Sequence, residues 1–364
     1  MARARARAPF WLAQPSRYSG LARPRAIGVA IALALVALLL AAIPAPATTD
    51  PDVTGTSLYD TVIDGVRAGG GYYQLLADTL RASSAALRPF LAFRLPTHAM
   101  VQALLPREAV VVALYLLAAG VGALWWTRLA AALPQAAPRL VAMILLTGGM
   151  VTFVQADLIG FHEIWAGLLV ALALGRRRPG RWVEAVAVAA IAALVRETAA
   201  VSLLVMAAFA WREGERREAA GWAIALGLVA IVLAVHAYAV AQVTGPLDPR
   251  LPAGSGLLGA GFVRDALVAA TAVRSLPPPL ASALVVLSLL GWSAWRDPLG
   301  KRVTTTLGVY AAAAAILADA DSFAWVLMIA PLWLVGLVFL PDLVRDLSVA
   351  ILDRRRVRVQ RVTQ

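Results

Sequence analysis

The side chains best suited to chemistry gather in one polar segment, residues 59–97. It carries Asp60 and Asp64, four positions apart, so both carboxylates lie on one face of a helical turn. Arg88 and Arg94 follow in the same segment. Carboxylates can exchange protons with a polar substrate, and guanidinium groups can bind its anionic groups. The combination indicates a binding site, although a solvated structural face explains each carboxylate taken singly.

The same segment contains three glycines followed by Tyr72 and Tyr73. The glycines allow a sharp turn or a close approach of the backbone to a ligand. The tyrosines open an amphipathic helix in which one face can lie on the membrane surface, formed by Leu75, Leu76, Thr79 and Leu80. A Pro-rich stretch before this segment presents two further carboxylates, Asp50 and Asp52.

Charged residues also interrupt apolar segments further along the chain. Arg196 and Glu197 lie between two short apolar stretches, and His162 and Glu163 lie early in another, just after Asp157. Charges inside a membrane are costly, face the protein interior and often mark a site. Arg196 therefore either joins two helices in a salt bridge or faces a phosphate. Glu163 either pairs with such an arginine or lines a cavity.

Composition identifies the elements that must position these residues. The 364 residues are 61% hydrophobic with a mean hydropathy of +0.76, far above soluble domains. We expect an all-α polytopic membrane protein with about ten spans, several of them short enough to be broken or paired helices. The expected segments are residues 26–43, 109–126, 140–154, 158–174, 182–195, 198–211, 222–242, 279–295, 303–318 and 323–340.

The distribution of charge predicts the orientation. With every segment crossing and both termini cytoplasmic, 24 of the 33 Lys and Arg residues lie inside, as the positive-inside rule requires. The domains are then a basic N-terminus (1–25), one transmembrane domain (26–340) with an outer loop at 44–108, and a basic tail (341–364). The basic runs at 175–181 and 211–218 both lie inside, so two short helices must form a hairpin between them, with Arg196 and Glu197 at its outer apex.

Several classes of site are excluded or unsupported. The net charge of +12 follows from the positive-inside rule, so we predict no nucleic-acid partner. There is no cysteine, and the three histidines are not in a metal-ligand spacing. Asp319 and Asp321 fit either a cation site or a tight solvated turn. The basic, apolar N-terminus fits either a cleavable signal peptide or a retained first span.

Four motifs in residues 26–211 together carry a resemblance. They are GGGYYQLLADTLR and RPFLAFRLPT in the outer loop, HEIWAGLLVALAL in a span and VRETAA at the hairpin. The arrangement resembles a bacterial GT-C fold glycosyltransferase that uses polyprenyl-phosphate sugars. Many such relatives have an Asp-Glu pair before the tyrosines, where this chain has Gly69 and Gly70. The catalytic carboxylate must then come from elsewhere in the loop.

The resemblance implies a sugar transfer at the periplasmic face of a bacterial inner membrane, from a polyprenyl-phosphate sugar donor to a glycan or lipid acceptor. It makes Asp60 and Asp64 the candidate bases, with Asp50 and Asp52 in reserve. It makes Arg88, Arg94 and Arg196 candidates for the phosphate, and Tyr72 and Tyr73 either stack on the sugar or anchor their helix. Asp157, His162, Glu163 and Glu197 would line the substrate cavity. It implies no organic cofactor and leaves a divalent cation open.

Two alternatives belong to other classes. A multi-pass transporter would be expected to show internal repeats with matched broken helices, and none is evident in the sequence. An O-antigen polymerase or ligase normally has its large outer loop late in the chain, whereas the larger loop here is early.

Overall fold

The computed structural model describes residues 9–43, 54–250, 257–316 and 322–352, and the helices in these ranges are joined by loops without any strand. The predicted all-α fold is confirmed for this part of the chain. Among the described residues, three helices are long and apolar enough to cross a membrane: α1 (Arg23–Ala42), α5 (Arg107–Ala130) and α10 (Arg216–Val243). Three shorter helices are also apolar: α6 (Ala136–Gly149), α8 (Val183–Val195) and α12 (Pro278–Ala294). The count of ten spans stays a prediction.

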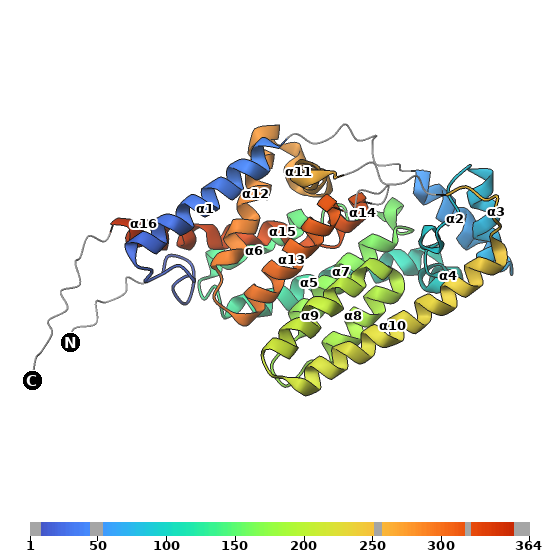
Figure 1. Cartoon of the computed structure of the whole chain (residues 1–364), viewed down its shortest axis with the longest axis horizontal. Coiled ribbons are helices and arrows are strands. Elements are labelled where there is room, and N and C mark those ends of the chain that lie inside the picture. Colours follow the sequence, from blue (N-terminus) through green and yellow to red (C-terminus); the bar gives the residue numbers. More distant parts are fainter. Residues whose placement is uncertain (1–8, 44–53, 251–256, 317–321, 353–364) are drawn as a thin grey trace, which may run out of the picture.

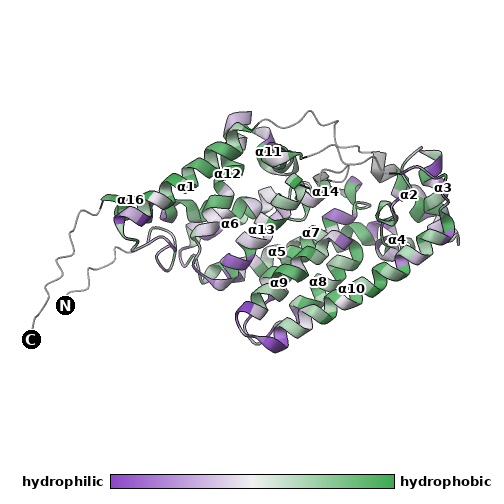
Figure 2. Ribbon diagram, in the orientation of Figure 1, coloured by the Kyte–Doolittle hydropathy of each residue, from purple (hydrophilic) through white to green (hydrophobic). Residues whose placement is uncertain are grey.

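Further helices complete the bundle (Figure 1). They are α7 (His162–Arg176), α9 (Ala200–Arg212), α11 (Gly259–Ala270), α13 (Pro298–Ile316) and α16 (Leu340–Leu352). Most helices of the bundle are apolar along their length, and polar residues gather at the turn between α9 and α10 (Figure 2). We call the end of the bundle that carries Arg128, Arg177 and Arg296 the basic end. The opposite end, where α5 begins and α10 finishes, is the loop end.

The apolar segment predicted at 323–340 is broken. It forms α14 (Ser322–Leu327), α15 (Ala330–Trp333) and the 3₁₀ helix η5 (Leu334–Phe339). Pro331 lacks the backbone N–H that a continuous helix needs there. A Cβ on Gly291 of α12 would collide with the carbonyl oxygen of Gly336, and a Cβ on Gly336 would collide with the carbonyl oxygen of Ser288 on α12. Small residues allow this close helix crossing, as they do in membrane bundles.

The hairpin predicted between the two basic runs is present. Helix α8 ends at Val195, the 3₁₀ helix η3 (Glu197–Ala199) follows, and α9 returns to the basic end. Arg196 and Glu197 are therefore at its apex, which belongs to the loop end of the bundle. Tyr310 of α13 fastens the apex, because its hydroxyl donates a 2.9 Å hydrogen bond to the carbonyl oxygen of Thr198.

A second, smaller core covers the loop end. It is formed by α2 (Thr54–Arg67), α3 (Tyr72–Ala82) and α4 (Pro96–Leu104), which lie beside the last turns of α10 (Figure 1). The amphipathic helix predicted after the glycines is thus present. Its apolar face does not lie on the membrane surface as expected, because Leu76 and Leu80 are buried in this second core together with Val62 and Phe93.

The segment before α1 is folded against the basic end. One carboxylate oxygen of Asp342 accepts the backbone N–H of Phe10, and the other accepts those of Trp11 and Leu12, at 2.5 to 2.9 Å. Asp346 accepts the N–H of Ser16 at 2.8 Å. Both carboxylates come from α16 and are buried. These contacts fasten the segment before α1 to α16.

Candidate functional site

Four charged side chains meet at the loop end, and we call them the ion cluster. Arg196 Nε lies 2.8 Å from Glu163 Oε1, and Arg196 Nη1 also contacts Glu197. Arg94 adds longer contacts, 3.8 Å to Glu163 and 4.0 Å to Glu197. The loop between η1 (Phe90–Ala92) and α4 supplies Arg94, α7 supplies Glu163, and the hairpin apex supplies the other two.

The ion cluster is electrically balanced and largely buried. Two guanidinium groups face two carboxylates, and the exposed fraction of Arg196 is 1% and that of Glu163 is 5%. A buried arginine that is already paired with carboxylates is poorly placed to hold a phosphate. The geometry therefore favours the salt-bridge alternative for Arg196, in which it joins the hairpin to α7.

Two histidines lie between the ion cluster and α2. The His162 ring is 4.5 Å from the His98 ring and 4.9 Å from the Tyr59 ring. Gln102 uses its amide nitrogen to contact His98 Nε2 at 2.9 Å and to donate to the carbonyl oxygen of Ile159 at 2.8 Å. Because that nitrogen can only donate, His98 Nε2 must accept and its proton lies on Nδ1. Burial lowers the pKa of His98 to about 3, so the ring is neutral.

Asp60 lines a cavity of about 210 Å³ next to these histidines. The other lining residues are Ile63, Asp64, Arg67, Gln102, Arg107, Val110 and Ile159. Asp60 is half-buried, whereas Arg107 is exposed and, in the described part of the chain, has no ion-pair partner. The cavity therefore combines a partly shielded carboxylate with an unpaired guanidinium group.

The surroundings adjust the acidity of Asp60. Burial raises its pKa above the ordinary value, the positive charge of Arg107 opposes this, and the negative charge of Asp64 adds to it. A carboxylate with a raised pKa is a better proton acceptor while it stays ionised near neutral pH. Asp60 is therefore better suited to accept a proton than a fully solvated aspartate.

The second candidate base, Asp64, is differently placed. It lies 2.8 Å from Arg67 in an exposed i,i+3 ion pair, with 72% of its side chain exposed. Such a pair is solvated and weakly held. The structure thus separates the two carboxylates that the sequence treated alike, because only Asp60 is shielded from water.

The remaining predicted residues are spread over the loop end. Tyr72 donates a 2.7 Å hydrogen bond to the carbonyl oxygen of Arg94, and Tyr73 lies 3.1 Å from Nδ1 of His236. Both tyrosines thus act as anchors for α3.

Arg88 donates a 2.9 Å hydrogen bond to the carbonyl oxygen of Pro246 and so holds the loop that follows α10. Asp157 is exposed in η2 (Ala156–Leu158).

Some predicted residues cannot be placed. Asp50, Asp52, Asp319 and Asp321 lie outside the described residues. Within the described ranges, no group of three or more His, Asp or Glu side chains is arranged to hold a metal ion. A divalent cation therefore has no assigned ligands here.

Sequence reasoning missed three residues of this region: Arg107, His98 and Gln102. Arg107 had a detectable signal, because it is an arginine at the predicted outer end of a span, where the positive-inside rule disfavours one. His98 and Gln102 had no comparable signal. They come together with Ile159 only through the packing of α4 against the start of α7.

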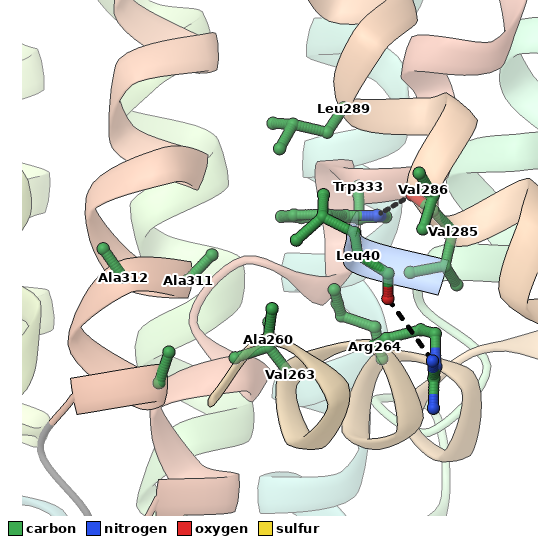
Figure 3. A pocket seen from close by; sticks show the side chains of 12 residues that line it. Leu40, Ala260, Val263, Arg264, Val285, Val286, Leu289, Ala311, Ala312 and Trp333 are labelled. Atoms are coloured by element: carbon green, nitrogen blue, oxygen red, sulfur yellow. Dashed lines mark hydrogen bonds between the residues drawn. The ribbon is translucent and has the colours of Figure 1, made fainter. Parts of the chain in front are cut away.

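A second cavity at the loop end is apolar. It measures about 160 Å³ and lies between the end of α1 and helices α11, α12 and α13 (Figure 3). Arg264 is its one charged lining residue, and it donates to the carbonyl oxygens of Leu40, Ala41 and Ile43 at the end of α1. This cavity can accept hydrocarbon, but it offers no group for acid–base chemistry.

Comparison with known proteins adds no identification, because no protein-family model, no curated protein and no solved structure matches this chain. The function must therefore be argued from the cavity at Asp60.

Proposed function

We propose that the protein is a membrane glycosyltransferase that moves a sugar from a lipid-phosphate donor to an acceptor hydroxyl, with Asp60 as the general base. The observation that carries the proposal is the shared cavity of Asp60 and Arg107 at the loop end. One residue can take a proton and the other can hold an anionic leaving group, and both are within reach of one small volume.

The proposed reaction is a single displacement with inversion at the sugar. The acceptor oxygen forms a bond to the anomeric carbon as the bond from that carbon to the phosphate oxygen breaks. The acceptor proton passes to Asp60, and the electron pair leaves with the lipid phosphate, whose added negative charge is stabilised by Arg107. The raised pKa of Asp60 supports its role as the proton acceptor.

The ion cluster has a positioning role in this proposal. Tyr59, the neighbour of Asp60, packs against His162, and His162 precedes Glu163 in the first turn of α7. A continuous set of contacts thus connects the wall of the cavity to Arg196. The buried charges hold α7, the hairpin apex and the loop before α4 in one arrangement. Tyr59 of α2 packs against the first residue of α7, so this arrangement also positions Asp60 beside the cavity.

The membrane setting supports the choice of a lipid-linked donor. α5 is one of the three helices suited to cross a bilayer, and Arg107 is its first residue. A phosphate at the surface of the bilayer would lie at this depth. The proposal places the reaction at the outer face of a bacterial inner membrane, with a polyprenyl-phosphate sugar as donor and a glycan or lipid as acceptor.

The proposal is tested by profiling lipids and glycans in a deletion strain complemented with wild-type protein, Asp60→Asn or Asp64→Asn. We expect one glycan or glycolipid to lose a sugar in the deletion strain. Wild-type protein and Asp64→Asn should restore it, and Asp60→Asn should not, at equal membrane levels of all three proteins. An unchanged profile in the deletion strain, or restoration by Asp60→Asn, would contradict the proposal.

A further inference from the structure

The largest of the three cavities described here lies at the basic end, away from Asp60. It measures about 330 Å³ and is bounded by the folded N-terminal segment, the end of α5 and the turn between α12 and α13. Its lining residues are Leu12, Ala13, Gln14, Arg128, Ala131, Ala132, Trp295, Arg296, Asp297, Pro298 and Leu299.

The polar groups of this cavity are predominantly cationic. Arg128 and Arg296 line it, and Arg17 lies next to it, donating to the carbonyl oxygen of Trp295 at 2.9 Å. Asp297 is the one carboxylate in the lining, and one of its oxygens already accepts the backbone N–H of Leu299 at 2.7 Å. The basic groups therefore exceed the acidic ones around this volume.

The arginines are only partly satisfied by the protein. Arg128 donates through Nη2 to the carbonyl oxygen of Arg177 at 3.1 Å, while its buried Nε has no hydrogen-bond partner in the part of the chain that the structure describes. Arg296 donates to the carbonyl oxygen of Ser16 at 3.1 Å. These partners are neutral carbonyls. The negative charge of Asp297 offsets part of the positive charge at Arg128. The positive charge that remains in this partly shielded space favours binding of a further anion.

The positive-inside rule accounts for arginines at this end but not for their convergence on a cavity. Arg212 and Arg216, for comparison, are exposed at the turn between α9 and α10. Basic pockets between transmembrane helices on the cytoplasmic side are a recognised way of binding lipid headgroups that carry phosphate. Guanidinium groups suit this ligand because they make paired, charge-assisted hydrogen bonds to phosphate oxygens.

We infer that this cavity is a binding site for a phosphate group, held by Arg128 and Arg296. The phosphate comes either from the headgroup of an anionic membrane lipid or from a free phosphate compound in solution. The site is separate from the proposed sugar transfer, because its residues belong to the opposite end of the bundle. It holds the N-terminal segment, α5 and the turn between α12 and α13 together through a shared ligand.

The test uses delipidated full-length protein and two matched double variants. Arg128→Gln with Arg296→Gln removes two charges from the cavity. Arg212→Gln with Arg216→Gln removes two charges from the same end of the bundle outside it. In the first arm, native mass spectrometry measures binding of phosphatidylglycerol, with phosphatidylcholine as the zwitterionic reference. In the second arm, calorimetry measures binding of inorganic pyrophosphate to protein in phosphatidylcholine nanodiscs.

We expect the cavity variant to bind the anionic probe at least tenfold more weakly than wild type, and the control variant to stay within twofold. A loss seen only with phosphatidylglycerol assigns the site to a lipid headgroup, and a loss seen with pyrophosphate assigns it to a soluble phosphate. Equal losses in both variants, or no loss in either arm, would overturn the inference. Arg296→Gln alone, a change at an exposed residue, decides the matter if the double variant does not fold.

Discussion

Arg196 Nε lies 2.8 Å from Glu163 Oε1, and both side chains are almost wholly buried. The contact joins the hairpin apex to the first turn of α7 and so ties together two elements that the sequence separates by 33 positions. Arg196 also contacts Glu197, and Arg94 approaches both Glu163 and Glu197 from the outer loop. The hairpin apex, α7 and the outer loop are therefore joined by one charge-balanced ion cluster.

The first prediction concerns this contact. Arg196→Gln should leave Glu163 and Glu197 underpaired and lower the free energy of unfolding by about 3 to 5 kcal/mol. Adding Glu163→Gln to it should recover a large part of the loss, because fewer buried charges then lack partners. Thermal unfolding of the purified single and double variants measures both effects. A double variant less stable than Arg196→Gln alone would contradict the pairing.

The second prediction concerns the N-terminal segment. Asp342→Asn should lower the free energy of unfolding by about 2 to 4 kcal/mol, because a charged acceptor of three backbone N–H groups is replaced by a neutral one. Asp346→Asn is the matched control and should lower the free energy of unfolding by a smaller amount, since the Asp346 carboxylate accepts one backbone N–H group. Thermal unfolding measures the difference. A larger loss for Asp346→Asn would show that the segment is not held by Asp342.

The third prediction concerns the stability at acid pH. Burial lowers the pKa of His98 to about 3, below the ordinary value of 6.5. Between these two values the unfolded chain binds a proton that the folded protein does not, so stability should fall as pH drops below 6.5. His98→Gln should reduce this dependence. Melting temperatures from pH 7.5 to 5.0 check it, and an equal slope in wild type and variant would exclude His98 as the cause.

The fourth prediction concerns the pH dependence of transfer. Activity should fall at acid pH as Asp60 becomes protonated. Arg107 lowers the pKa of Asp60, so Arg107→Gln should move the acid limb of the profile to higher pH. Asp64 raises that pKa, so Asp64→Asn should move the limb to lower pH. Rate profiles of the two variants measure the opposite shifts, and shifts of the same sign would rule out Asp60 as the titrating group.

The sequence predicted helices correctly where the length of an apolar segment and the basic runs at its ends defined the segment. The short hairpin around Arg196 followed from two basic runs separated by too few residues for two full spans, and it is present. Helix α11 was not predicted, because Arg264 and Asp265 interrupt its apolar pattern. The break at 323–340 depends on the close approach of Gly336 to α12, which is a property of packing between distant segments.

The candidate site was predictable only in part. The sequence identified Asp60, and the motif around Arg196 indicated a buried ion pair. The sequence did not distinguish Asp60 from Asp64. The two carboxylates differ in exposure to water, because Ile159 and Gly160, which are distant in sequence, lie beside Asp60. The sequence also assigned Arg196 equally to a salt bridge and to a phosphate. Only the positions of Glu163 and Glu197 around it favour the first.

The fifth prediction addresses the central claim, that Asp60 takes the acceptor proton. The most direct measurement is the turnover of purified Asp60→Asn and Asp64→Asn with the donor and acceptor named by the profiling experiment. We predict that Asp60→Asn binds donor normally but loses turnover by about 10²-fold or more, the usual scale of general-base catalysis, while Asp64→Asn stays close to wild type. Full turnover in Asp60→Asn would contradict the account.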